Sequence, residues 1–187
     1  MATTREEKIA SNTVFAGKLV RVRVDTVELP DGRQAFREVV GHRAAAVVVP
    51  IDADGNVVLV RQYRYPVGED LLEAPAGVME EGETPDECAI RELQEETGHR
   101  ARSLVRLGQF WSVPGFCDEL MHVYLARDLE PSELEADPDE NITNELVPFT
   151  SVVELVRTGV IQDAKTIAAL LMATHFESGG VTDGDSR

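Results

Sequence analysis

One continuous apolar run of strand length constrains the fold more than any other feature of the sequence. Residues Ala44 to Ile51 carry no charged side chain and no side-chain hydrogen-bonding group. A strand with one wet face alternates apolar and polar residues, whereas an unbroken run is typical of a strand covered on both faces. The chain has 187 residues, of which 43% are hydrophobic, which suits one domain of ordinary size with at most a small appendage. We therefore expect a sheet buried between layers.

The patterns on either side of this run predict an α+β fold with a mixed sheet between helices. Alternating Val20–Val24 and the stretch Ala35–Val40 flank a Pro-Asp-Gly turn, which indicates an antiparallel hairpin. Residues 1–13 are polar, and we expect them to be loosely held. Further strands are expected at 57–63, 108–111, 122–126 and 146–149, and helices at 151–159, where Ser151 and Glu154 suggest a capping box, and at 165–175. Strands, one central helix, more strands and a helical end are typical of α+β proteins.

The clearest helix signal lies between Thr84 and Gly98. Thr84 and Glu87 have the spacing of a capping box, Pro85 takes the first helical position, and Gly98 follows the last turn. The predicted apolar face of this helix consists of Ala89, Ile90, Leu93 and Thr97.

Acidic residues gather on the same helix. The chain has 18 Lys and Arg against 34 Asp and Glu, a net charge of −16, which argues against nucleic acid or an anionic membrane as partner. Glu92, Glu95 and Glu96 stand at i, i+3 and i+4, on neighbouring turns. Glu92 and Glu96 flank the apolar face, so we expect them at the edge of the core. A solvated acidic face is the alternative interpretation.

Clustered carboxylates at a core edge repel one another unless a cation joins them. Carboxylate oxygens are the ligands that Mg²⁺ or Mn²⁺ prefers, and protein-bound Mg²⁺ usually contacts phosphate. The small residues of Glu73–Gly77, followed by Gly82, allow close backbone approach, and the Ala76 carbonyl offers one more oxygen ligand. The pattern therefore indicates phosphate or diphosphate chemistry.

The spacing Gly77-x5-Glu83-x7-Arg91-Glu92-Leu-Gln-Glu95-Glu96-Thr-Gly98 resembles the Nudix box, Gly-x5-Glu-x7-Arg-Glu-U-x-Glu-Glu-x-Gly-U, where U is aliphatic. His99 departs from the last position of that pattern. The resemblance implies an α/β/α sandwich with a mixed sheet, preceded here by an N-terminal antiparallel strand segment. It also implies hydrolysis of a nucleoside diphosphate linked to another group, with Mg²⁺ or Mn²⁺ as cofactor.

By position in the box, the resemblance assigns metal-ligand and catalytic roles to Glu92, Glu95 and Glu96. It assigns structural roles to Gly77, Glu83, Arg91 and Gly98. We expect a structural salt bridge from Arg91, because its place in the helix puts it on a different face from the three carboxylates.

A second resemblance concerns the substrate. Pro114 lies sixteen residues after Gly98, and Ser112–Glu119 resembles a loop of the ADP-ribose pyrophosphatase branch. Segments similar to that branch also occur at 36–40, 61–66, 72–77 and 163–168, and the resemblance spans Arg37 to Phe176. It implies conversion of ADP-ribose to AMP and ribose 5-phosphate. The alternatives are hydrolysis of another sugar nucleotide such as GDP-mannose, and a non-catalytic domain that binds ADP-ribose.

Candidate substrate-binding residues are Arg37, Arg64, Glu73, Pro114, Gly115 and Phe116. Either arginine can pair with a diphosphate or cover an adenine, and a surface salt bridge is the alternative for each. Tyr65 is interpreted as a core residue. In the ADP-ribose branch a glutamate from the loop before the last strand activates the water, which points to Glu140 as catalytic base, with Asp139 as the alternate. A merely solvated acidic loop is the other interpretation.

The expected organisation has three parts: strands over 1–42, a Nudix domain over 43–177 and a disordered tail over 178–187. The N-terminal strands resemble those that exchange between subunits in the ADP-ribose branch, so a homodimer is expected, with Arg37 reaching the partner's active site. We find no secretory signal and no apolar run near the roughly 18 residues of a membrane span. Two cysteines are too few for a disulfide scaffold, which favours the cytoplasm.

Overall fold

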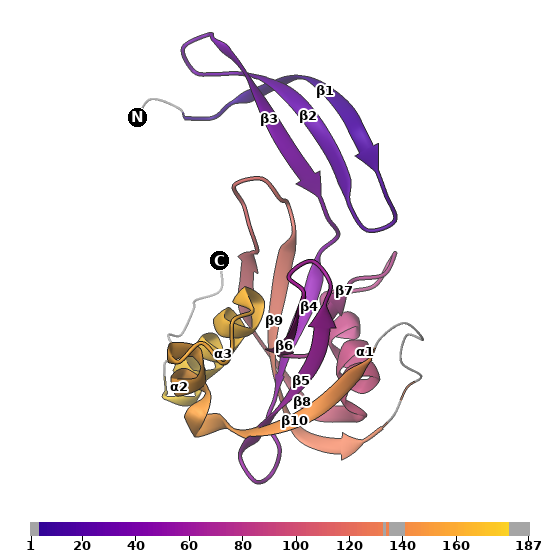
Figure 1. The fold of residues 1–187 in the computed structure, drawn as a ribbon, viewed down its shortest axis with the longest axis vertical. Helices are drawn as coiled ribbons and strands as arrows, with labels where there is room; N and C mark the ends of the chain where they lie inside the picture. The colour runs from indigo at the N-terminus through magenta and orange to yellow at the C-terminus, as the bar shows by residue number, and fades with distance from the viewer. Residues whose placement is uncertain (1–3, 133, 135–140, 180–187) are drawn as a thin grey trace. The chain divides into compact units, whose positions relative to one another are not determined.

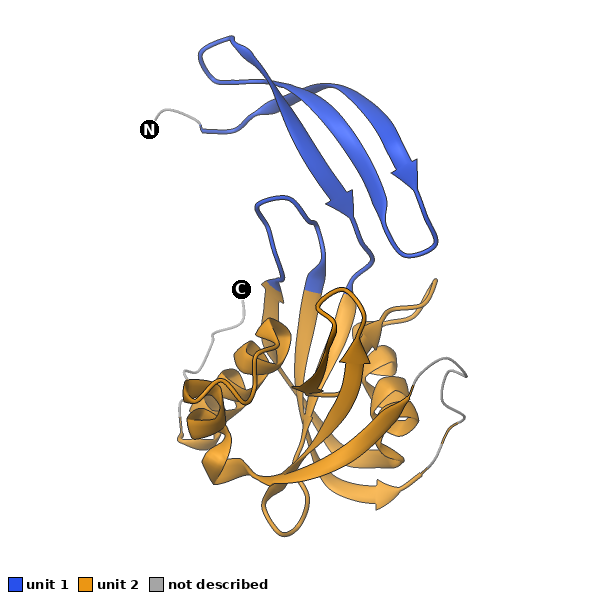
Figure 2. Cartoon of the chain, viewed as in Figure 1, with its two compact units in different colours: residues 1–44, 111–120 blue, residues 45–110, 121–187 orange. Residues whose placement is uncertain are grey.

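The structure, a computed structural model, describes residues 4–132, 134 and 141–179. The chain separates into two compact units, one within residues 1–44 and 111–120 and one within 45–110 and 121–187 (Figure 2). The expected organisation has 111–120 within the Nudix domain of residues 43–177, whereas this segment belongs to the first unit. Backbone hydrogen bonds explain the difference, because the Val40 amide donates to the Phe116 carbonyl and the Asp118 amide donates to the Val40 carbonyl. Residues 180–187 of the predicted tail lie outside the described part.

The first unit is built on an antiparallel sheet with the order β1-β2-β3 (Figure 1). Its strands are β1 (Glu7–Ala16), β2 (Arg21–Glu28) and β3 (Gln34–Gly41). The predicted hairpin of β2 and β3 is confirmed, with Arg21 opposite Gly41 and Glu28 opposite Gln34. The expectation of a loosely held segment over 1–13 is wrong for the strand region. Backbone pairing with β2 orders β1 although all ten of its residues are exposed.

The second unit contains two sheets. The four-stranded sheet has the order β7-β4-β9-β8, with strands β4 (Ala45–Pro50), β7 (Ala76–Val78), β8 (His99–Trp111) and β9 (Leu120–Pro131). Because β4 is antiparallel to β7 and parallel to β9, this sheet is mixed, as predicted. The three-stranded sheet has the order β10-β5-β6, with strands β5 (Asn56–Arg64), β6 (Glu69–Glu73) and β10 (Ile142–Pro148). Strands β6 and β7 are not among the strands expected from the sequence pattern.

Helices cover both faces of the mixed sheet, so the α/β/α sandwich is confirmed (Figure 1). The helices are α1 (Pro85–Thr97), α2 (Val152–Arg157), which follows a 3-10 turn at Phe149–Ser151, and α3 (Ala164–Glu177). All six residues of β4 are buried. Ala46 and Val48 join a core cluster with side chains of α1, whereas Val47 and Val49 join one with side chains of α3. The apolar run is therefore the central strand that its pattern predicts.

The signals that bound α1 are confirmed in detail. The Thr84 side chain accepts from the Glu87 amide, the Glu87 side chain accepts from the Thr84 amide, and Gly98 ends the helix in the left-handed region at φ 71°. The predicted apolar face needs one correction, since Ile90 is 43% exposed and Cys88 is buried in its place. The described part of the chain contains no helix long and apolar enough to cross a membrane.

The second predicted capping box is wrong. Ser151 has helical backbone angles and belongs to the 3-10 turn, and its hydroxyl donates to the Pro148 carbonyl instead of accepting from a helix amide. In α3 the capping residue is Asp163, whose carboxylate accepts from the Thr166 amide.

Candidate active site

Two carboxylate side chains of α1 are almost completely buried. Glu92 is 8% exposed and Glu96 is 7% exposed, which confirms their predicted position at the edge of the core. Glu95 is partly buried. The Ala76 amide donates to Glu96 Oε2 at 3.1 Å, so strand β7 is tied to the last turns of α1. The Glu96 carboxylate is therefore held against the backbone of β7.

Gly77 makes this close approach possible. A Cβ atom at residue 77 would lie 1.9 Å from Glu92 Oε1 and 2.1 Å from Glu92 Cδ, far inside contact distance. Glycine is needed here for the space it leaves and not for its backbone freedom, because the φ of Gly77 lies outside the left-handed region. Any larger residue would therefore displace the Glu92 carboxylate.

Arg91 gathers the carboxylates of the box around its guanidinium. Its Nε and Nη2 donate to Glu83 at 2.8 and 2.9 Å, and its Nη1 donates to Glu92 at 2.6 Å and to Glu95 at 2.9 Å. The expected structural salt bridge of Arg91 is present, with Glu83. The expectation that Arg91 lies on a different face from the carboxylates is wrong for Glu95, which stands four residues later on the same helix face. Hydrogen bonds from Arg91 hold the pKa of Glu83 below its usual value.

The carboxylates of Glu92, Glu95 and Glu96 are the candidate metal ligands. Within the described ranges, no group of three or more His, Cys, Asp or Glu side chains is arranged to hold a metal ion. Arg91 engages oxygens of Glu92 and Glu95 instead. Carboxylate oxygens are nevertheless the donors that a hard divalent cation prefers, and the missing side chain of Gly77 lets the Glu92 carboxylate lie against the backbone of β7. In donor type, these residues fit such a cation.

Glu73 and Arg64 form a second charged cluster in the same unit. The Glu73 side chain is 1% exposed, and it accepts from Arg64 Nε at 2.8 Å, from Arg64 Nη2 at 2.7 Å and from Lys165 Nζ. Two cations thus engage this buried carboxylate, and a substrate-binding role for Glu73 stays a prediction. Glu73 holds Arg64, whose own side chain is 39% exposed.

The charge of Glu73 has a consequence for stability. Burial by itself would raise the pKa of Glu73, but hydrogen bonds from Arg64 and the charge of Lys165 outweigh burial and leave the pKa below its usual value. A carboxylate with a lowered folded-state pKa stabilises the fold above its unfolded pKa of about 4.3, and this contribution is lost as the pH falls through the folded value.

We therefore predict that Glu73→Gln costs most stability near neutral pH. The difference in free energy of unfolding between wild type and variant should shrink as the pH falls from about 6 to about 3. Urea unfolding followed at several pH values measures it. A difference that stays constant with pH would show that Glu73 gains nothing from its ionised partners.

Other predicted residues belong to the first unit or lie outside the described part. Arg37 donates through Nε to Glu6 at 3.0 Å, which is the salt-bridge alternative. The other predicted substrate residues of this unit, Pro114, Gly115 and Phe116, are exposed. Tyr65, in the second unit, is 86% exposed, so its interpretation as a core residue is wrong. Glu140 and Asp139 lie outside the described residues.

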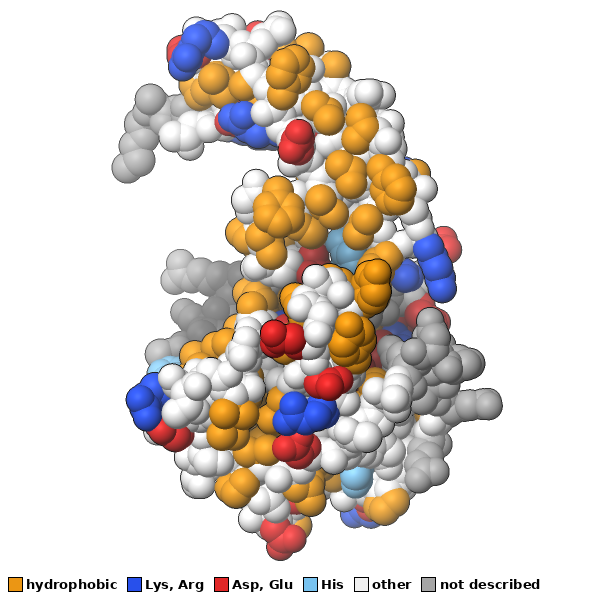
Figure 3. Space-filling model, in the orientation of Figure 1, with side chains coloured by type: hydrophobic (Ala, Val, Ile, Leu, Met, Phe, Trp, Pro, Cys, Tyr) orange, Lys and Arg blue, Asp and Glu red, His pale blue; other side chains and the backbone are white. Residues whose placement is uncertain are grey.

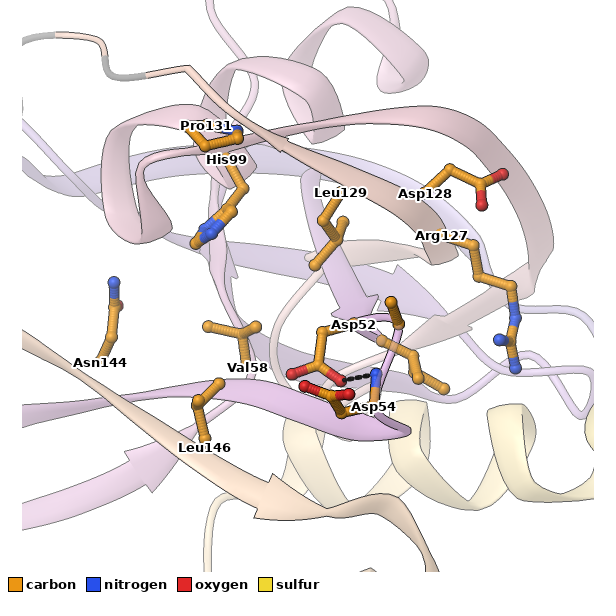
Figure 4. A pocket seen from close by; sticks show the side chains of 12 residues that line it. Asp52, Asp54, Val58, His99, Arg127, Asp128, Leu129, Pro131, Asn144 and Leu146 are labelled. Atoms are coloured by element: carbon orange, nitrogen blue, oxygen red, sulfur yellow. Dashed lines mark hydrogen bonds between the residues drawn. The ribbon is translucent and has the colours of Figure 1, made fainter.

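A cavity of about 670 Å³ lies elsewhere in the second unit (Figure 4). Apolar side chains of β5, β9 and β10 line it together with His99, Asn144 and the Asp52 turn. None of the box glutamates is among its lining residues. His99, the departure from the box pattern, lies with Nδ1 2.8 Å from the Thr97 carbonyl, so a polar contact with the end of α1 replaces apolar packing.

Comparison with known protein families decides the assignment. A model described as the NUDIX domain matches residues 41–170. The chain belongs to the Nudix family. A model described as the nucleoside diphosphate sugar hydrolase N-terminal domain matches residues 6–40 of this Nudix protein, which include β1, β2 and all of β3 except Gly41.

Individual relatives agree with the family. The Nudix chain is 38% identical to an ADP-ribose pyrophosphatase of Bacillus subtilis (strain 168), over 91% of this chain and 93% of the relative. It is 33% identical to a GDP-mannose pyrophosphatase of Cronobacter sakazakii, over 74% of this chain and 75% of the relative. A solved structure of an ADP compounds hydrolase matches with a TM-score of 0.86 and 26% identity, over 94% of this chain and 96% of that one.

Sequence reasoning missed two groups of residues near the Nudix box. Lys165 and Thr166 at the start of α3 contact the segment that leads into the box, and Asp163 accepts hydrogen bonds from both of them. Their signal was present as an Asp-x-Lys-Thr segment at a helix start. Tyr124 is 1% exposed and donates to Asp86 in the first turn of α1 at 2.5 Å, and its signal is a lone hydroxyl within an apolar strand.

Proposed function

We propose that this Nudix protein hydrolyses the diphosphate of ADP-ribose to AMP and ribose 5-phosphate in the presence of Mg²⁺. The observation that carries this substrate is 38% identity to an ADP-ribose pyrophosphatase along 91% of the chain. Similarity to a GDP-mannose pyrophosphatase is lower and covers 74% of the chain, and that substrate is the alternative. A full set of box glutamates argues against a domain that only binds ADP-ribose, because binding alone does not need them.

The proposed metal ligands are the carboxylates of Glu92, Glu95 and Glu96 and the carbonyl of Ala76. When bound, a divalent cation polarises a diphosphate and lowers the pKa of a coordinated water. The hydrogen bonds between Arg91 and Glu83 fix the box loop to the helix. Arg64 binds Glu73 with one edge of its guanidinium and keeps further N–H donors for the substrate diphosphate.

The proposed general base is Glu140, with Asp139 as the alternate. Described residues on both sides of that segment contact the last turn of α1. Ser132 donates through its amide to the Gly98 carbonyl, and the Asn144 side chain donates to the Thr97 carbonyl. Both ends of the segment are therefore tied close to Glu95 and Glu96, which supports a base from this loop.

A product assay tests the proposed reaction. Purified protein is incubated with ADP-ribose and Mg²⁺, with and without EDTA, and the products are identified by mass spectrometry. We expect AMP and ribose 5-phosphate in equal amounts, and their loss with EDTA. Adenosine or ADP as the nucleotide product, or equal turnover in EDTA, would refute the proposed chemistry.

We also propose that the protein is a cytoplasmic homodimer in which Arg37 reaches the partner's active site. The first unit supports a partner, because several large apolar side chains of its strands and turns are exposed, and such surfaces mark interfaces (Figure 3). They are Ile9, Val14, Phe15, Leu19 and Phe36, the last at 73% exposure. The free thiols of Cys88 and Cys117 suit a reducing compartment.

Light scattering tests the dimer. We expect twice the chain mass of 20.5 kDa for the wild type and a lower mass for Phe15→Asp combined with Phe36→Asp. Charge on an apolar interface opposes its burial. A wild-type mass of 20.5 kDa at micromolar concentration would exclude the dimer and the role of Arg37 in it.

A further inference from the structure

The first turn of α3 contacts the segment that leads into the Nudix box. Asp163 Oδ2 accepts from the Thr166 amide at 2.9 Å and from the Thr166 hydroxyl at 2.6 Å. The same hydroxyl oxygen accepts from the Ala74 amide at 2.8 Å. Thr166 is fully buried, so this chain of hydrogen bonds is shielded from water. The backbone at residue 74 is thus fixed by a helix that the box itself does not include.

Lys165, one residue earlier, contacts the adjacent side chain of the same segment. Its Nζ donates to Glu73 Oε2 and to Asp163 Oδ2, the second at 2.8 Å, and its side chain is 17% exposed. Glu73 therefore lies between two cations, Lys165 and Arg64. Since both cations bind one buried carboxylate, the position of Arg64 depends on how Glu73 is held.

Contacts with β4 and α1 hold the other end of segment 73–77. The Val48 amide of β4 donates to the Pro75 carbonyl at 2.9 Å, and the Ala76 amide donates to Glu96. Gly77 then passes beside the Glu92 carboxylate. Hydrogen bonds therefore fix both ends of segment 73–77, with α3 binding its start and α1 binding its end.

We propose that Lys165 and Thr166 are positioning residues for the reaction, an inference that rests on the proposed function. Lys165 fixes Glu73 so that Arg64 presents its remaining donors to the diphosphate. Thr166 fixes the backbone that leads to Ala76, whose amide donates to Glu96. A merely structural contact would be served as well by apolar packing, because a buried ion pair is costly to desolvate.

Substitutions at the two residues should affect different kinetic constants. We expect Lys165→Met to raise KM for ADP-ribose on the order of tenfold with a smaller change in kcat, because the substrate-facing arginine loses its fixed position. We expect Thr166→Val to lower kcat by roughly tenfold or more with a smaller change in KM, because the backbone beside the carboxylates shifts. Lys165→Arg and Thr166→Ser keep the charge and the hydroxyl, and should restore much of each loss.

Lys18→Met is the matched control, since Lys18 is an exposed lysine of the first unit. It should leave KM and kcat unchanged. The proposal is overturned if Lys165→Met and Thr166→Val keep wild-type KM and kcat. It is also overturned if every loss disappears when the assay temperature is lowered in step with each variant's thermal midpoint, since the role is then only structural.

Hydrogen exchange separates failure of this inference from failure of the proposed function. A wild type that does not cleave ADP-ribose refutes the proposed function. In that case, faster exchange of the amides of Ala74, Ala76 and Gly77 in Thr166→Val, with the rest of the second unit unchanged, still supports the anchoring by α3. Unchanged exchange at these amides would overturn it whatever the substrate.

Discussion

Glu96→Gln should lower kcat for ADP-ribose on the order of a thousandfold and leave the fold intact, because the variant loses a charged ligand at the reacting diphosphate. The fold should survive because an amide oxygen still accepts the hydrogen bond that the Ala76 amide gives to Glu96. Initial rates at saturating Mg²⁺ measure the loss, and the thermal midpoint checks the fold. Raising Mg²⁺ should recover little of the activity, because the missing charge is part of the site.

Glu81→Gln provides the matched control for this experiment. Glu81 is an exposed acid of the box loop, so its replacement changes the net charge equally without touching the cluster. Its activity should equal that of the wild type. Near-full activity of Glu96→Gln would show that Glu96 of α1 is not a metal ligand. Glu140→Gln and Asp139→Asn tested side by side identify the base, since only one of them should lose kcat.

The second large effect is expected at Gly77. Gly77→Ala should reduce kcat/KM on the order of a hundredfold, because the new Cβ would lie 1.9 Å from Glu92 Oε1 and must push that carboxylate away. The obstacle is the end of a flexible side chain, so the chain can relieve the clash by moving Glu92. We therefore expect little change in the thermal midpoint beside a severe loss of activity.

Gly55→Ala should show the opposite pattern. Gly55 has φ +81° and open space around its Cβ position, so alanine there is strained by about 1 kcal/mol but contacts nothing in the site. Its midpoint should fall while kcat/KM stays at the wild-type value. If Gly77→Ala instead unfolds the protein, or remains fully active, the close approach of β7 to Glu92 has no catalytic importance.

Features encoded by neighbouring residues were predictable from the sequence. The unbroken apolar run identified β4 as the covered strand, and the capping box with its terminal glycine identified both ends of α1. The spacing of Glu92 and Glu96 beside the apolar stripe predicted their burial. Each of these depends on contacts within one or two turns, where periodicity is informative.

Features that depend on distant contacts were not predictable. Glu73 gave no sign that Lys165 would neutralise it, since the two lie 92 residues apart in the sequence. Segment 111–120 joined the first unit through hydrogen bonds with Val40 that no local pattern encodes. Pairing with β2 likewise ordered a polar first strand.

A single competition digest tests the central claim most directly. Equimolar ADP-ribose, GDP-mannose and NADH are incubated together with the wild type in Mg²⁺, and the disappearance of each is followed by mass spectrometry beside Glu96→Gln. The account predicts that ADP-ribose is consumed first, giving AMP and ribose 5-phosphate, and that the variant consumes none of the three at a comparable rate. Preferential loss of GDP-mannose or NADH, or equal consumption by the variant, would contradict it.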